Sequence, residues 1–195
     1  MGKEPPRQLV ELLERLDLAS AEQVARVERR AARLARDLPL FESVWIDALA
    51  QTRILTAYQA AELNAGRGHQ LALGPYVLGQ PLGSWGYAAA YRARPRGSRE
   101  SVQLLVAEVS PPLAAGTLAQ LQALADHREP LRQLPLNPVE QVGLEGQRLW
   151  AVSAYHAGRT ALEGMVSNGR FPPEVVLEIA RQMLVGLETL ERVGL

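Results

Sequence analysis

The residues best suited to do chemistry lie between Tyr76 and Val109, where Gly83 and Gly86 stand in a turn between two apolar segments. A glycine turn between strands lets backbone N–H groups approach a phosphate closely, because no Cβ stands in the way. The same pattern is typical of an ordinary hairpin whose glycines only supply a positive φ. Two glycines alone do not decide between these interpretations. We expect the strands of this stretch at about residues 76–83, 88–94 and 102–109.

The composition excludes several other kinds of site. The 195 residues include no cysteine, which excludes disulfides, thiol catalysis and cysteine zinc sites. The three histidines have no metal-ligand spacing, and those near Asp126 and Ser153 lack a third orienting partner, so we predict neither a metal site nor a catalytic histidine. These histidines are His69, His127 and His156.

Charge and hydropathy argue against nucleic acid and membrane as partners. Lys and Arg balance Asp and Glu at 21 each, and no apolar run approaches the ~20 residues that span a bilayer. The N-terminus lacks an apolar signal core, so we expect a cytoplasmic protein with protein partners. Five arginines of one predicted helix alternate with acidic residues and have no aromatic neighbour, which favours a solvated face. They are Arg26, Arg29, Arg30, Arg33 and Arg36.

Residues 1–65 are predicted to form a helical N-terminal segment. Ser20 and Thr56 each precede a helical pattern and have glutamine three residues later, which is the spacing of a capping box. This similarity indicates either a degenerate internal repeat, packed as a four-helix unit, or two helices with the same common cap. We expect a second helix that runs from Ser20 until Pro39 breaks it. The tryptophans at 45 and 150 are expected in the core.

The pattern changes after a glycine-rich linker at 66–75. From residue 76 to 154 it predicts five strands and one helix capped by Thr117, the last two strands at 139–144 and 148–154. Residues 155–195 return to helical periodicity, with a short helix at about 160–167. A long helix follows Pro172 and Pro173, with one apolar face. Its face comprises Val176, Ile179, Ala180, Met183, Leu187 and Leu190.

This order of elements resembles the smaller lobe (N-lobe) of a protein kinase followed by the start of its larger lobe (C-lobe). Residues 82–93 resemble the glycine-rich loop, 105–109 the Val-Ala-Ile-Lys strand, and 149–160 the hinge. Residues 55–60 and 73–76 resemble the segment before many bacterial Ser/Thr kinase domains. The resemblance implies an α+β fold with a five-stranded antiparallel sheet, one helix and the first C-lobe helices.

The resemblance also implies a degenerate nucleotide pocket. Trp85 and Ala88 replace the second and third glycines of the loop, and Glu108 stands where the family has its ATP-binding lysine. A swapped ion pair of Glu108 with Arg128, near Glu129, is conceivable. Ala90 and Ser153 are small and leave room for a nucleotide. ATP is therefore a possible but doubtful ligand. The implied pocket positions are Gly83, Ser84, Trp85, Gly86, Ala88, Ala90, Glu108, Ser153 and Tyr155.

Three hypotheses about function follow from these departures. The 195 residues contain neither a His-Arg-Asp catalytic loop nor an Asp-Phe-Gly metal motif. The first hypothesis is a pseudokinase that acts in regulation or protein–protein interaction. The second is the N-terminal part of an active bacterial Ser/Thr kinase whose catalytic half lies beyond Leu195. The third is a helical adaptor module on a kinase-like scaffold.

Overall fold

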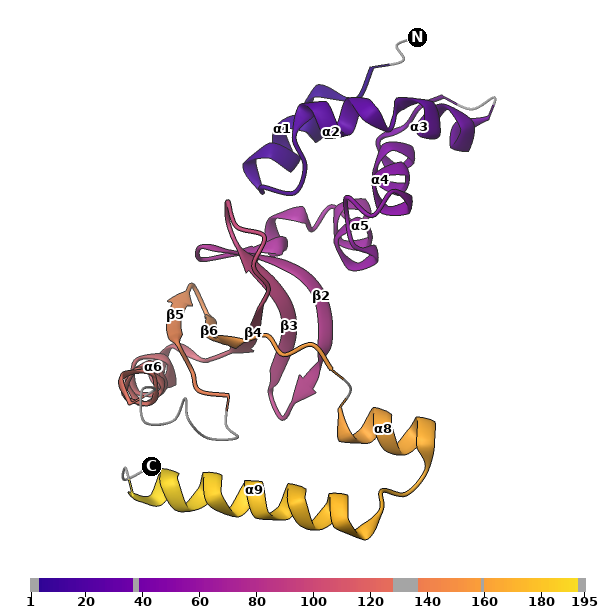
Figure 1. The fold of residues 1–195 in the computed structure, drawn as a ribbon. Coiled ribbons are helices and arrows are strands. Elements are labelled where there is room, and N and C mark those ends of the chain that lie inside the picture. Colours follow the sequence, from indigo (N-terminus) through magenta and orange to yellow (C-terminus); the bar gives the residue numbers. More distant parts are fainter. Residues whose placement is uncertain (1–3, 37–38, 128–136, 159, 193–195) are drawn as a thin grey trace. The chain divides into compact units, whose positions relative to one another are not determined.

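The computed structural model describes residues 4–36, 39–127, 137–158 and 160–192 (Figure 1). The chain consists of two compact units, Met1–Val102 and Gln103–Leu195. For Trp85, the structure describes the backbone but not the side chain. Arg128 and Glu129, which the sequence suggested as neighbours of Glu108, lie outside the described residues.

Five short helices form the N-terminal part of the first unit, and their apolar stripes face one another. Trp45, Leu13 and Leu49 are completely buried between them, which confirms the core position predicted for Trp45. The single helix predicted from Ser20 to Pro39 is wrong, because the backbone leaves helical geometry at Val27 (ψ 2°). The helices are α1 (Arg7–Arg15), α2 (Ala21–Arg26), α3 (Glu28–Ala35), α4 (Glu42–Gln51) and α5 (Ala57–Asn64).

The structure shows the same turn and cap geometry in two pairs of helices. The α1–α2 and α4–α5 turns are both Schellman motifs, in which the N–H of Leu18 bonds to the carbonyl of Leu13 (2.8 Å) and that of Ile54 to the carbonyl of Leu49 (3.0 Å). Each turn then leads to a complete capping box three residues from its residue of positive φ. The two pairs therefore share one backbone design, which we call the first and second helix pair.

Three strands complete the first unit, in the order β1-β2-β3, all antiparallel. The segment expected as a linker, 66–75, carries a short 3-10 helix and the first strand, and its Leu71 and Leu73 are fully buried. Helix α5 packs against β2 (Figure 1). The elements are η1 (Gly68–Leu71), β1 (Ala72–Leu73), β2 (Tyr76–Trp85) and β3 (Ala88–Pro95).

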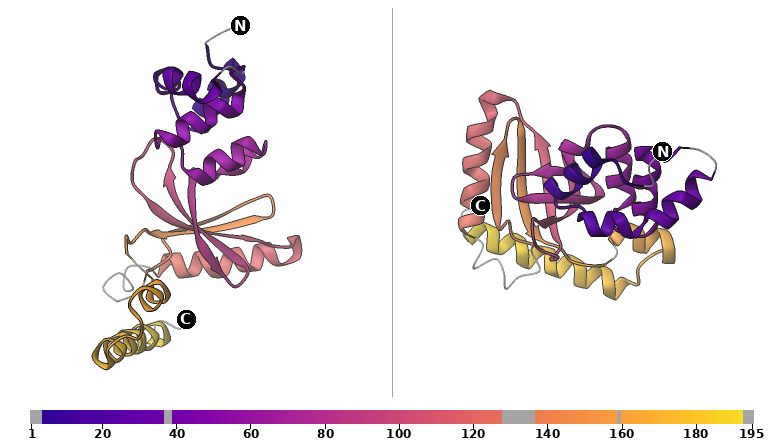
Figure 2. Two further views of the ribbon diagram at one scale, coloured as in Figure 1. Left: turned by 90° about the vertical axis from the view of Figure 1, so that its right-hand side faces the viewer. Right: turned by 90° about the horizontal axis from the view of Figure 1, so that it is seen from above.

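The second unit contains three strands in the order β4-β6-β5, with α6 lying along β5 and β6 (Figure 2). The prediction that Thr117 caps the helix is wrong. The helix begins six residues earlier, at Pro111, because proline is tolerated in the first turn, where its missing N–H has no partner to lose. The elements are β4 (Val102–Glu108), α6 (Pro111–Asp126), β5 (Gln141–Glu145) and β6 (Arg148–Ala154).

Two further helices, α8 (Ala161–Asn168) and α9 (Pro173–Arg192), follow β6. The predicted apolar face of α9 is present, but it is exposed: Met183 and Leu187 are 62% and 59% accessible. In the described part of the chain, no helix combines the length and apolar character that crossing a bilayer requires.

Candidate functional site

The glycine turn is a tight hairpin between β2 and β3. The two strands stay paired up to Trp85 and Ala88, so only Gly86 and Tyr87 form the turn. Gly86 has a φ of +57°, as expected at the first central position of a type II′ turn. A Cβ at Gly83 or Gly86 would meet no atom within 4 Å. Both glycines are therefore explained by their positive φ, not by a close approach of other atoms.

The predicted loop positions line up across this hairpin. Gly83, Ser84 and Trp85 face Ala90, Ala89 and Ala88 across the hairpin, so the predicted loop positions come together as a strand ladder. The side chain of Tyr87 at the tip is fully exposed, while Ala90 is 4% exposed. Obstruction of a phosphate by the Trp85 indole stays a prediction.

Glu108 is the last residue of β4 and is exposed to solvent. The next residue, Val109, donates its N–H to the carbonyl of Gln147 (2.9 Å), which holds the end of the strand. Within the described ranges, no cation forms an ion pair with Glu108. The carboxylate is thus a solvated negative charge at the place where the resemblance expects a lysine.

The two positions that resemble the kinase hinge region, Ser153 and Tyr155, lie at the end of β6 and directly after it. Ser153 is 6% exposed, and Asn137 donates from Nδ2 both to its hydroxyl oxygen (3.2 Å) and to the carbonyl of Ala154 (2.9 Å). Tyr155 follows, half-buried. Asn137 was missed by the sequence reasoning, because a single asparagine in a proline-punctuated loop carries no signal of its long-range partner.

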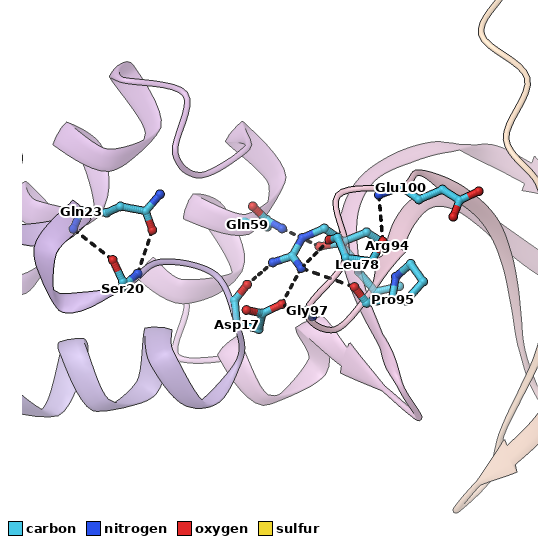
Figure 3. Close-up of polar contacts among 10 residues, drawn as sticks. Asp17, Ser20, Gln23, Gln59, Leu78, Arg94, Pro95, Gly97 and Glu100 are labelled. Carbon is cyan, nitrogen blue, oxygen red and sulfur yellow. Dashed lines mark hydrogen bonds and ion pairs between the residues drawn. The ribbon is translucent and has the colours of Figure 1, made fainter.

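A second polar cluster in the first unit also escaped the sequence reasoning. Asp17 accepts hydrogen bonds from the Gly97 N–H (2.8 Å) and from Arg94 Nη1 (2.5 Å), and Arg94 Nη2 also donates to the Asp17 carbonyl (Figure 3). The Gly97 amide, with the Arg94 guanidinium, lowers the pKa of the Asp17 carboxyl below its usual value. This cluster ties the first helix pair to the turn after β3.

Two cavities of the first unit flank this cluster. One, of about 510 Å³, lies between the first helix pair and the turn after β3, and the other, of about 280 Å³, lies between α5 and the strands. Neither contains any of the nine predicted pocket positions. The described residues include no group of three or more acidic or histidine side chains able to hold a metal. The larger cavity is lined by Glu14, Asp17, Leu18, Ala19, Ser20, Gln23, Arg94, Gly97, Ser98 and Arg99.

Comparison with known proteins shows the fold. The crystal structure of a point mutant of the Mycobacterium tuberculosis PknI kinase domain is similar to this chain, with a TM-score of 0.52 and 22% identity, over 64% of this chain and 51% of that one. A crystal structure of Rad53 in complex with AMP-PNP has a TM-score of 0.50 and 15% identity, over 59% and 29%. No protein-family model matches the sequence, and no curated protein does.

These likenesses confirm the predicted α+β class, a kinase-like smaller lobe with helices around it. At such identities they concern the fold alone. The chain spans about half of the PknI chain and less than a third of the Rad53 chain. Activity, substrates and partners are therefore matters of proposal.

Proposed function

We propose that this kinase-like chain is a pseudokinase, which does not transfer phosphate and acts through contacts with other proteins. The observation that carries the proposal is Glu108, an exposed carboxylate at the end of β4. By resemblance, this is the position from which a kinase lysine holds the α- and β-phosphates of ATP.

The sign of the charge matters more than the loss of a contact. Two unit charges ~4 Å apart interact by about 4 kcal/mol at an effective dielectric constant near 20, and solvent screening lowers this for an exposed group such as Glu108. A lysine would attract the phosphates, whereas a carboxylate repels them. The paired hairpin at Gly83 to Ala90 supports the proposal, because its turn offers few free backbone N–H groups to a phosphate.

The proposal extends to partners and location. A balanced charge of 21 basic and 21 acidic residues favours a protein partner over nucleic acid or an anionic membrane. The absence of cysteine agrees with a cytoplasmic protein, since no disulfide is needed.

Binding of Mg-ATP, followed by thermal shift and by a fluorescent nucleotide analogue, tests the proposal. We expect no saturable binding to the wild-type chain and a gain in affinity for Glu108→Lys. Glu100→Lys, which makes the same charge change at an exposed position after β3, is the control and should gain nothing. Saturable binding by the wild type, together with incorporation of labelled phosphate by this chain or a longer form of it, would refute the proposal in favour of an active kinase.

A further inference from the structure

The second helix pair shows how a capping box of this protein binds an extended strand. Thr56 donates its hydroxyl to the carbonyl of Gly79. Gln59 donates from Nε2 to the carbonyl of Leu78 (2.7 Å; Figure 3). The same two side chains form the capping box of α5, with the Gln59 Oε1 accepting from the Thr56 N–H (3.0 Å). Gln59 thus caps the helix with Oε1 and binds a strand carbonyl with Nε2. The Thr56 hydroxyl does both with one oxygen, which accepts from the Gln59 N–H (3.1 Å) and donates to Gly79.

The first helix pair has the same box without a strand. Ser20 and Gln23 occupy the corresponding positions, and the Gln23 Oε1 accepts from the Ser20 N–H (2.8 Å). In the part of the chain that the structure describes, neither the Gln23 Nε2 nor the Ser20 hydroxyl hydrogen has an acceptor. Both side chains are exposed and line the cavity of about 510 Å³. This volume is in the range of ligand sites.

One cation of the cavity lining is available to an acidic occupant. Asp17 is bound by Arg94 and Gly97, and the Glu14 Oε1 accepts from the Ala21 N–H (2.9 Å), so both carboxylates of the lining are engaged. Arg99 lines the same cavity, is exposed, and forms no ion pair with any described residue. Its guanidinium can hold a carboxylate with two parallel hydrogen bonds.

We infer that this cavity binds an extended peptide segment with an acidic side chain, from a partner protein. The Gln23 amide and the Ser20 hydroxyl donate to two successive backbone carbonyls, as Gln59 and Thr56 do to Leu78 and Gly79. Arg99 pairs with the carboxylate of the peptide. The inference rests on the shared cap geometry of the two helix pairs and on the cavity, not on the loss of phosphate transfer, so the nucleotide experiment can fail without affecting it.

Fluorescence anisotropy with two labelled hexapeptides tests the inference on the full 195-residue chain. The acidic probe, Glu-Val-Leu-Gly-Gln-Glu, carries the strand sequence that the second helix pair binds, between two glutamates. The basic probe replaces both glutamates with lysine. We expect saturable binding of the acidic probe and binding at least tenfold weaker for the basic one. No saturable binding, or equal binding of both probes, would overturn the inference.

Two variants with matched controls locate the binding. Gln23→Glu keeps the acceptor of the capping box but loses the amide donor, and should lower the affinity for the acidic probe at least tenfold. Arg99→Gln removes the guanidinium that has no ion pair and should lower the affinity for the acidic probe at least fivefold. Gln8→Glu on α1 and Arg33→Gln on α3 make the same changes outside the cavity lining and should bind as the wild type does. Wild-type affinity in both cavity variants contradicts the assignment.

Discussion

At the scale of residues, one side chain does two different things in the two helix pairs. The Gln59 side chain is buried (6% exposed) and its amide donates to a strand carbonyl, whereas the Gln23 side chain is exposed and its amide donates to no described residue. Each also supplies the acceptor of its capping box. Glutamate can replace glutamine as that acceptor but cannot donate while ionised. Glutamine-to-glutamate substitutions at the two positions therefore test the amide donor while the capping acceptor is kept.

We predict that Gln59→Glu lowers the free energy of unfolding by about 1–3 kcal/mol or more. The change leaves the Leu78 carbonyl without its donor and buries a carboxylate next to it. Gln23→Glu, the same substitution at the equivalent position, should change the stability by less than about 0.5 kcal/mol. Urea denaturation at pH 7 measures both. Equal losses at the two positions would show that the strand contact of Gln59 contributes nothing.

We also predict that the stabilising effect of Asp17 depends on pH. Its pKa is lowered in the folded state by Gly97 and Arg94, so its contribution is present above the unfolded pKa of about 3.9 and is lost as pH falls through the folded pKa. Asp17→Asn should therefore be less stable than the wild type at pH 7, with the gap closing below about pH 4. The loss should stay near 1 kcal/mol, because this side chain is 43% exposed.

Asparagine makes this comparison a clean one. It tolerates the left-handed conformation of residue 17, which has a φ of +55°, so the backbone of the turn is kept. Denaturation curves at pH values from 3 to 7 provide the measurement. A stability gap that stays constant over this range would mean that the charge of Asp17 plays no part.

At the scale of elements, the two helix pairs have the same turn, but only one of them offsets the backbone strain of its left-handed residue with side-chain contacts. Both Schellman turns place a residue with a Cβ in the left-handed region, Asp17 at φ +55° and Arg53 at φ +61°. The hydrogen bonds of Asp17 to Gly97 and Arg94 offset this cost. Within the described ranges, the exposed Arg53 side chain makes no such contact. Glycine is the residue that adopts this conformation without strain.

We therefore predict that Arg53→Gly raises the free energy of unfolding by about 0.5–1 kcal/mol. Asp17→Gly should destabilise the protein, because it removes the contacts with Arg94 and Gly97. Ala61→Gly, at an exposed position inside α5, is the control for the flexibility of glycine and should cost about 1 kcal/mol. Thermal and urea denaturation of the three variants distinguish these outcomes. Destabilisation by Arg53→Gly would show that the turn is not strained.

At the scale of the whole molecule, the sequence predicts the order of elements better than their contacts. Hydrophobic periodicity and the glycines and prolines between elements locate most helices and strands. The apolar pattern continues through Val27 and so hides the break there. Pro111 and Pro112 hide the start of α6, because prolines are as typical of the end of a strand as of the first turn of a helix. Asp17 and Arg94 lie 77 residues apart, so no local pattern reveals their contact.

Periodicity also cannot tell what covers an apolar face. The predicted stripe of α9 is present, yet Met183 and Leu187, one turn apart on it, are more than half exposed. Contiguous exposed apolar surface of this kind is typical of interaction sites and promotes association. A helix in a buried core would show the same apolar periodicity in its sequence, so the pattern does not distinguish the two cases.

We predict that the α9 face makes the 195-residue chain self-associate. Its sedimentation coefficient should rise with concentration, and the double variant Met183→Lys and Leu187→Lys should abolish the rise with little loss of stability, since both side chains are already largely exposed. Glu174→Gln with Glu188→Gln raises the net charge equally on the opposite face of α9 and should leave the association intact. Equal effects of the two double variants would mean that net charge, not the apolar face, controls association.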